Sequence, residues 1–194
     1  TVDEHTFFAI SNAHELKNKR LNLGTELASK LIFEIDRFEL LTVSLFFHDI
    51  AKGLEGDHSL NGSKIAKNLC PRFGMNSDDT EIVSWCVLNH LYLSETAFRY
   101  DLNDKKIIEK SVKKINSMKK LNLLFVLTVC DINAVGPGVW TDWKGSLLIE
   151  LYNKIKKNLA YIEVKNTPEK TENKSDKLFN EIRSLNILKD DEAQ

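Results

Sequence analysis

The sequence predicts an all-α protein, and three observations lead to that expectation. Apolar residues recur mostly at helical spacing, whereas strand-like alternation of apolar and polar residues is hard to find. Only 3 prolines and 8 glycines interrupt the 194 residues, so few positions break a helix. The longest apolar stretch, LNLLFVLTVC at 121–130, is too short to span a bilayer and therefore predicts a buried helix.

The other predicted helices are marked by their ends. An apolar helix ends where LFF meets His48 and Asp49, and the glycines of KGLEG break the chain soon afterwards. A new helix is expected from near Ser59, where Asp57 can cap it or orient a neighbouring ligand. The sequence GPG at 136–138 stops another helix. The residues after it predict an amphipathic helix with a wide apolar face formed by Trp140, Trp143, Leu147, Leu148, Leu151, Tyr152, Ile155 and Leu159.

One further helix is expected from about Asp78 to Leu91, with Ser77 in position to cap it. Its predicted core face consists of Ile82, Trp85, Cys86 and Leu88. The helical domain is expected to cover residues 1–164. The text KNTPEKTENKSDK then begins a polar connector over 165–194, in which apolar residues at 179, 182, 185 and 188 can form one short helix.

Composition narrows the class of protein. Lysine plus arginine total 27 against 28 acidic residues, so a net charge of -1 provides no electrostatic footprint for nucleic acid or an anionic membrane. Three cysteines form no CxxC pair and are interpreted as reduced core thiols, which with the lack of a secretory leader predicts a cytoplasmic protein. Because the chain begins with threonine and a motif follows at once, we expect a fragment of a longer protein.

The stretch LFFHDIAKGLEGDHS at 45–59 carries the clearest chemical signal. His48 and Asp49 follow an apolar run and need either partners or a bound ion, because unpaired polar groups in an apolar setting are costly. Asp131 follows the apolar run LFVLTVC in the same way. Imidazole and carboxylate together suit ions such as Mn, Fe, Co, Ni or Zn, and Asp49 is the natural bridge between two of them. The histidine and aspartate spacings match no short zinc pattern, so ordinary hydrogen-bonded histidines remain the alternative.

The motif HDIAKG, with a histidine upstream and an aspartate downstream, resembles the HD superfamily of helical metal-dependent phosphohydrolases. The segments TVDEHT, FFHDIAKGLEGDHSLNG, NHLYLSETAF and LTVCDINAVGPGVWTDWKGSLLIELY are similar, more narrowly, to the HD domains of bifunctional PII uridylyltransferase/uridylyl-removing enzymes. The likeness covers roughly residues 1–160, and DINAVGPGVWTDWK distinguishes this group from other HD hydrolases. The resemblance implies an HD-domain helical bundle with its metal site in a central cleft.

The resemblance also implies roles for individual residues. Lys52 and Asp49 are the candidate catalytic residues, and Lys52 can neutralise phosphate charge if its helix continues that far. Two divalent ions are implied, with Mn or Mg placed first and Fe or Co as alternatives. The implied metal ligands are His5, His48, Asp49, His58, His90 and Asp131.

The implied reaction is hydrolysis of the uridylyl-tyrosine bond of uridylylated PII, a nitrogen-regulation protein, with release of UMP. The nucleotidyltransferase and ACT domains of such enzymes are missing from this chain and would lie in cis. Two alternatives stay open at this point. The domain can be an HD hydrolase of a free or signalling nucleotide, or a non-catalytic helical regulatory module.

Overall fold

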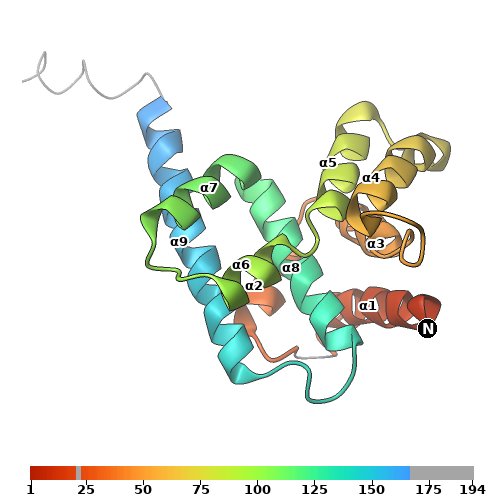
Figure 1. The fold of residues 1–194 in the computed structure, drawn as a ribbon, viewed down its shortest axis with the longest axis horizontal. Helices are drawn as coiled ribbons and strands as arrows, with labels where there is room; N and C mark the ends of the chain where they lie inside the picture. Colours follow the sequence, from red (N-terminus) through yellow and green to blue (C-terminus); the bar gives the residue numbers. More distant parts are fainter. Residues whose placement is uncertain (21–22, 167–194) are drawn as a thin grey trace, which may run out of the picture. The chain divides into compact units, whose positions relative to one another are not determined.

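The computed structural model describes residues 1–20 and 23–166, and within these ranges the chain forms helices and no β-strand. This is the all-α architecture that the sequence predicts (Figure 1). The helices in chain order are α1 (Val2–Lys17), α2 (Glu26–Glu34), α3 (Phe38–Phe47), α4 (His58–Leu69), the 3-10 helix η1 (Cys70–Phe73), α5 (Ser77–Leu88), α6 (Tyr92–Arg99), α7 (Lys105–Ile115), α8 (Met118–Ala134) and α9 (Asp142–Asn166).

The chain divides into two compact units, Thr1–Lys157 and Asn158–Gln194. The first unit contains α1 to α8 and the larger part of α9. The structure describes the second unit only as far as residue 166, where α9 ends. The predicted connector at 165–194, including its short helix, otherwise lies outside the described residues.

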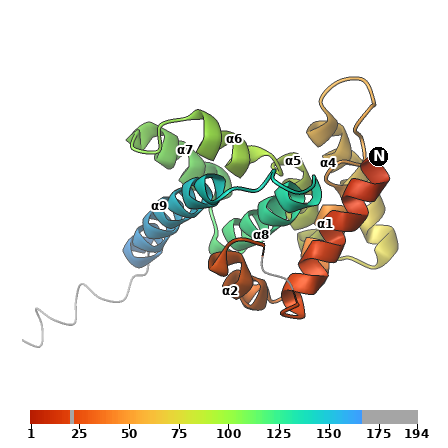
Figure 2. The same cartoon turned by 90° about the horizontal axis from the view of Figure 1, so that it is seen from below.

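Helix α8 forms the centre of the first unit, where it lies against α1, α2, α3, α5, α6 and α7 (Figures 1 and 2). Its residues 121–130 are all buried, as predicted, because neighbouring helices cover it on several sides. Helix α9 adds Tyr152, whose ring centre lies 5.1 Å from that of Phe125 and whose hydroxyl donates to Oδ1 of Asn122 over 2.8 Å. No helix among the described residues has the length and apolar character needed to cross a membrane.

Helix ends account for several differences from the sequence-based expectations. Asp57 caps α4, as predicted, by accepting hydrogen bonds from two backbone N–H groups. Helix α5 is capped by Asn76 rather than by Ser77, which is already helical. Leu88 is 40% exposed, so its assignment to the core was wrong. Apolar residues surround much of this helix, and a small rotation exchanges which of them face inward. Its buried apolar residues are Val83, Cys86 and Val87.

The tryptophans after the GPG sequence also differ from the expectation. Trp140 precedes α9 instead of belonging to it, and Trp143 is 64% exposed. Trp143 stacks on Phe98 of α6 with ring centres 6.4 Å apart. The apolar face of α9 is therefore narrower than its sequence pattern predicts, and the tryptophan at its start covers a neighbouring helix instead of entering the core.

Candidate metal centre

The centre is built around the carboxyl end of α3. This helix ends at Phe47, and His48 and Asp49 follow with both side chains buried. Nδ1 of His48 lies 2.6 Å from the carbonyl oxygen of Leu45. Because a carbonyl can only accept, Nδ1 carries a proton, and Nε2 is the atom with a free lone pair whenever the imidazole is neutral. The partial negative charge at the end of a helix adds to the attraction of this position for a cation.

His5 and Asp131 complete a first cluster with His48. Nε2 of His5 lies 2.8 Å from Oδ1 of Asp131 and 3.2 Å from Nε2 of His48. Nε2 of His48 lies 3.5 Å from the same aspartate oxygen. A capping box formed by Thr1 and Glu4 starts α1 just before His5, and α1 lies against α8. This helix pair brings together two residues that are 126 positions apart.

His58 and His90 form a second cluster with Asp49. His58 is the first residue of α4, and His90 follows the end of α5. Nδ1 of His90 lies 2.7 Å from the carbonyl oxygen of Val87, so its proton is assigned to Nδ1 by the same argument as in His48. Nε2 of His90 is buried and has no hydrogen-bond partner among the described residues. His58 and His90 both direct Nε2 towards the carboxylate of Asp49.

Asp49 lies between the two clusters and divides its oxygens between them. Oδ2 is 3.9 Å from Nε2 of His5 and 3.7 Å from Nε2 of His48. Oδ1 is 3.6 Å from Nε2 of His58 and 3.8 Å from Nε2 of His90. One carboxylate that faces two groups of nitrogen donors has the arrangement needed to bridge two cations.

Lys52 reaches the same carboxylate by a different route from the one expected. Helix α3 does not continue to Lys52. The chain instead follows short turns, in which the N–H of Lys52 donates to the carbonyl of Asp49 over 2.9 Å. The lysine side chain is 55% exposed, and its Nζ lies 2.7 Å from Oδ2 of Asp49. Its charge is therefore paired with the carboxylate at the outer edge of the centre.

Local charges set the protonation of the centre. Burial raises the pKa of a carboxyl group, but contacts from the two histidines of its cluster hold the pKa of Asp131 far below its usual range. Burial is likewise outweighed at Asp49, where the hydrogen bond from Lys52 lowers the pKa. For His48 the effect of burial is exceeded by that of Asp131, and the pKa rises. Burial dominates at His90 and lowers its pKa, which favours the neutral ligand form.

The residues present fit divalent cations. The donors form two groups of three residues. Within each group the three ligand atoms, one from each residue, lie within 4.8 Å of one another. Nitrogen and oxygen donors of this kind accept several divalent ions of the first transition series. A cation would also satisfy the buried Nε2 of His90, which otherwise carries the cost of a buried polar atom without a partner. The six residues expected from the sequence are therefore adjacent in space.

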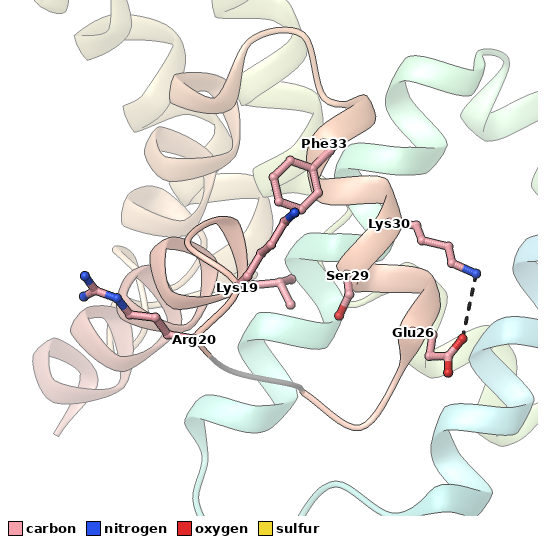
Figure 3. A pocket seen from close by; sticks show the side chains of 7 residues that line it. Lys19, Arg20, Glu26, Ser29, Lys30 and Phe33 are labelled. Carbon is pink, nitrogen blue, oxygen red and sulfur yellow. Dashed lines mark ion pairs between the residues drawn. The ribbon is translucent and has the colours of Figure 1, made fainter.

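Other charged residues lie apart from this centre. His14, the fifth histidine, packs edge-on against Phe38 with ring centres 4.9 Å apart. A hollow of about 550 Å³ is lined by the end of α1, by the residues that follow it and by one side of α2 (Figure 3). There Lys30 pairs with Glu26 over 3.8 Å (Figure 3). None of the residues lining this hollow belongs to either cluster, so it offers no comparable metal-binding chemistry.

A helical bundle that gathers histidine and aspartate from separate helices at one buried point defines a recognised class. The family model of the HD domain matches residues 2–132, and the chain belongs to this family. Three curated relatives are each named bifunctional uridylyltransferase/uridylyl-removing enzyme. The relative from Azospirillum brasilense is 46% identical over 154 residues, which cover 79% of this chain and 16% of the relative.

The other two relatives are similar to nearly the same extent. The one from Zymomonas mobilis subsp. mobilis is 45% identical over 152 residues, 78% of this chain and 16% of its own length. The one from Erythrobacter litoralis is 44% identical over 153 residues, 79% of this chain and 17% of its own length. The matched part of the chain thus spans about a sixth of each relative.

Proposed function

We propose that this chain is a metal-dependent phosphodiesterase that hydrolyses the uridylyl-tyrosine bond of uridylylated PII signalling protein and releases UMP in nitrogen regulation. The observation that carries the proposal is the pair of three-residue clusters that share the carboxylate of Asp49. The names of the relatives support the choice of substrate, because each includes a uridylyl-removing activity.

In this proposal each cluster provides the ligands for one divalent ion. His5, His48 and Asp131 would hold one divalent ion, His58 and His90 would hold a second, and Asp49 would contribute to both. When bound, such ions supply Lewis-acid charge that polarises a phosphoryl group and lowers the pKa of a water molecule. Mn or Mg is proposed first, with Fe or Co as alternatives, because the carboxylates suit Mn and Mg and the imidazoles suit ions of the first transition series.

The reaction requires little further acid catalysis. A bond forms between a water oxygen and phosphorus, the bond from phosphorus to the tyrosine oxygen breaks, and the water proton ends on the tyrosine. A phenol has a pKa of about 10, so the tyrosine departs as phenolate without a strong general acid. Lys52, which is half exposed beside Asp49, is proposed as the catalytic residue that neutralises phosphate charge.

The proposal extends to the organisation of the full-length protein. Residues 1–164 are proposed as the HD domain and 165–194 as the connector to domains in cis, namely nucleotidyltransferase and ACT domains. We also propose a cytoplasmic location, which the three buried free cysteines fit.

The decisive change is Asp49→Asn, which keeps the side-chain shape and removes the charge that links two cations. Release of UMP from uridylylated PII should require Mn or Mg, stop with chelator and fall by at least about 100-fold in the variant. A chromatographic assay of UMP measures this, with circular dichroism to verify folding. Asp104→Asn is the matched control, because asparagine caps α7 as well as aspartate does.

Normal turnover by Asp49→Asn would contradict the bridged centre. Hydrolysis of free nucleotides, with uridylylated PII left intact, would instead favour a small-molecule HD hydrolase. A folded, metal-loaded chain without any turnover would favour the non-catalytic module.

A further inference from the structure

A small polar hollow opens beside the second cluster. Its volume is about 270 Å³, and His58 forms part of its wall while Nε2 of the same residue lies 3.6 Å from Asp49. A molecule bound at the metal centre can therefore extend directly into this hollow. The volume lies just below the range of about 300–1,000 Å³ that is usual for drug-sized ligands. It suits a single nucleoside and is too small for a folded peptide segment.

The hollow has a fixed aromatic wall. Tyr92 begins α6, is half-buried and has its hydroxyl 3.0 Å from Oγ of Ser111. Ser111 itself donates to the carbonyl of Ile107 over 2.9 Å, so the tyrosine is the donor in the first contact. This chain of hydrogen bonds holds the tyrosine ring in one orientation. Planar nucleobases stack on such rings, and stacking loses less entropy when the ring is already ordered.

A positive charge lies against this wall. Nζ of Lys114, on α7, is 4.9 Å from the centre of the Tyr92 ring, and Lys114 forms no ion pair with any described residue. Of the two acidic residues that line the same hollow, Glu95 faces Arg99 across 3.7 Å, and Asp57 accepts from two backbone N–H groups of α4. The lysine ammonium can therefore donate to the carbonyl oxygens of a pyrimidine, which accept hydrogen bonds.

A second hollow, near the first cluster, has the opposite character. It measures about 640 Å³ and is lined by Phe8, Val135 and Trp140 among others. Phe8 and Val135 follow His5 and Asp131 by one helical turn and are 61% and 60% exposed. A large apolar hollow fits a protein side chain and its neighbours better than a ribose. Of the two hollows, the small polar one matches a nucleoside.

We propose that the hollow lined by His58, Tyr92 and Lys114 is the nucleoside subsite of the centre, in which Tyr92 stacks on the pyrimidine and Lys114 donates to its carbonyl oxygens. Tyr92 and Lys114 are then specificity-determining residues. The inference deepens the proposed function and rests on it for the identity of the nucleoside. Sequence reasoning missed both residues, although the placement of Tyr92 two positions after His90 could have indicated it.

Two readouts test the subsite with Lys114→Met and Tyr92→Leu. The first is the affinity of UMP measured by calorimetry, and the second is hydrolysis of two chromogenic esters. The p-nitrophenyl ester of UMP contains the nucleoside, whereas methyl p-nitrophenyl phosphate carries a methyl group in its place. Each variant should weaken UMP binding and raise KM for the UMP ester by about tenfold, with hydrolysis of the other ester unchanged.

Two matched variants serve as controls. Lys113→Met removes an exposed lysine next to Lys114 that does not line the hollow, and it should behave as wild type. Tyr92→Phe keeps the ring but removes its hydrogen bond to Ser111, so it should weaken UMP binding less than Tyr92→Leu does.

Unchanged UMP affinity in both Lys114→Met and Tyr92→Leu would overturn the subsite, and so would equal losses on the two esters. A selective loss on the UMP ester, in a chain that leaves uridylylated PII intact, would support the subsite while the proposed protein substrate fails. The two proposals therefore fail on different results.

Discussion

The two clusters that share Asp49 differ in how their donor atoms are satisfied. In the first, the nitrogens of His5 and His48 lie 2.8 Å and 3.5 Å from one oxygen of Asp131. In the second, the histidine nitrogens stand 3.6 Å and 3.8 Å from Asp49, and Nε2 of His90 has no partner among the described residues. Each cluster contains one fully buried imidazole, His48 in the first and His90 in the second, yet only the first cluster forms a close network of its own.

This difference separates folding from binding. The carboxylate of Asp131 accepts from His5 and, when His48 is protonated, also pairs with His48, so these contacts replace contacts with water and the first cluster stabilises the fold by itself. A buried nitrogen without a partner costs free energy until a cation binds it. We therefore expect the first cluster to contribute to the stability of the metal-free chain and the second to contribute mainly once metal is present.

The largest expected effect on stability comes from His48→Leu. The substitution removes a buried partner of Asp131 and should lower the free energy of unfolding by about 2 kcal/mol in chelator, because the carboxylate loses a charge-assisted contact. Urea unfolding followed by circular dichroism measures the change. An unaltered unfolding midpoint would show that the first cluster does not stabilise the metal-free fold.

A buried pair outside both clusters supplies the reference. Tyr152→Phe removes the hydrogen bond to Asn122 and should cost about 1 kcal/mol, equally with and without metal. A metal-dependent cost would mean that the core and the centre are coupled, and that comparisons between the clusters reflect more than local contacts.

The same tyrosine predicts a dependence on alkaline pH. Burial, with the nearby charge of Glu34, raises the pKa of Tyr152 to about 12, against about 10 in an unfolded chain. Its contribution is complete below pH 10 and is lost as the pH rises towards 12, because the unfolded tyrosine ionises first. Unfolding of the wild type and of Tyr152→Phe between those pH values should converge, and parallel curves would argue against the shift.

The smallest effect in chelator is expected from His90→Leu. This change removes the unpartnered nitrogen, and the carbonyl of Val87 keeps backbone N–H donors, so stability should change by less than about 0.5 kcal/mol. With Mn at 100 times its Kd, the wild type should gain about 2.7 kcal/mol. The variant should gain less. His14→Leu is the control, since His14 lies outside both clusters. A loss of about 2 kcal/mol in metal-free His90→Leu would show that the second cluster stabilises the metal-free chain as much as the first does.

Individual helices show which features of the fold could be predicted from the sequence. The burial of α8 was predictable because apolar residues occupy every face of that segment, so no choice of face was needed. Helix α5 required such a choice, and Leu88 was assigned to the wrong side. The end of α3 at Phe47 was predicted, because the apolar run stops at His48 and Asp49. The turns that carry Lys52 back to Asp49 were not predicted, because no proline or glycine lies between those two residues.

The sequence by itself determined the helices, the buried α8 and the adjacent His48 and Asp49, because these depend on local spacing and on apolar runs. Only the tertiary structure decided that His5, His58, His90 and Asp131 gather around His48 and Asp49, since packing of α1, α4 and α5 around α3 and α8 closes those separations. It also decided which imidazole nitrogen faces the centre, through carbonyls three residues earlier. Such outcomes arise from three-dimensional packing and hydrogen-bond geometry, which residue spacing does not encode.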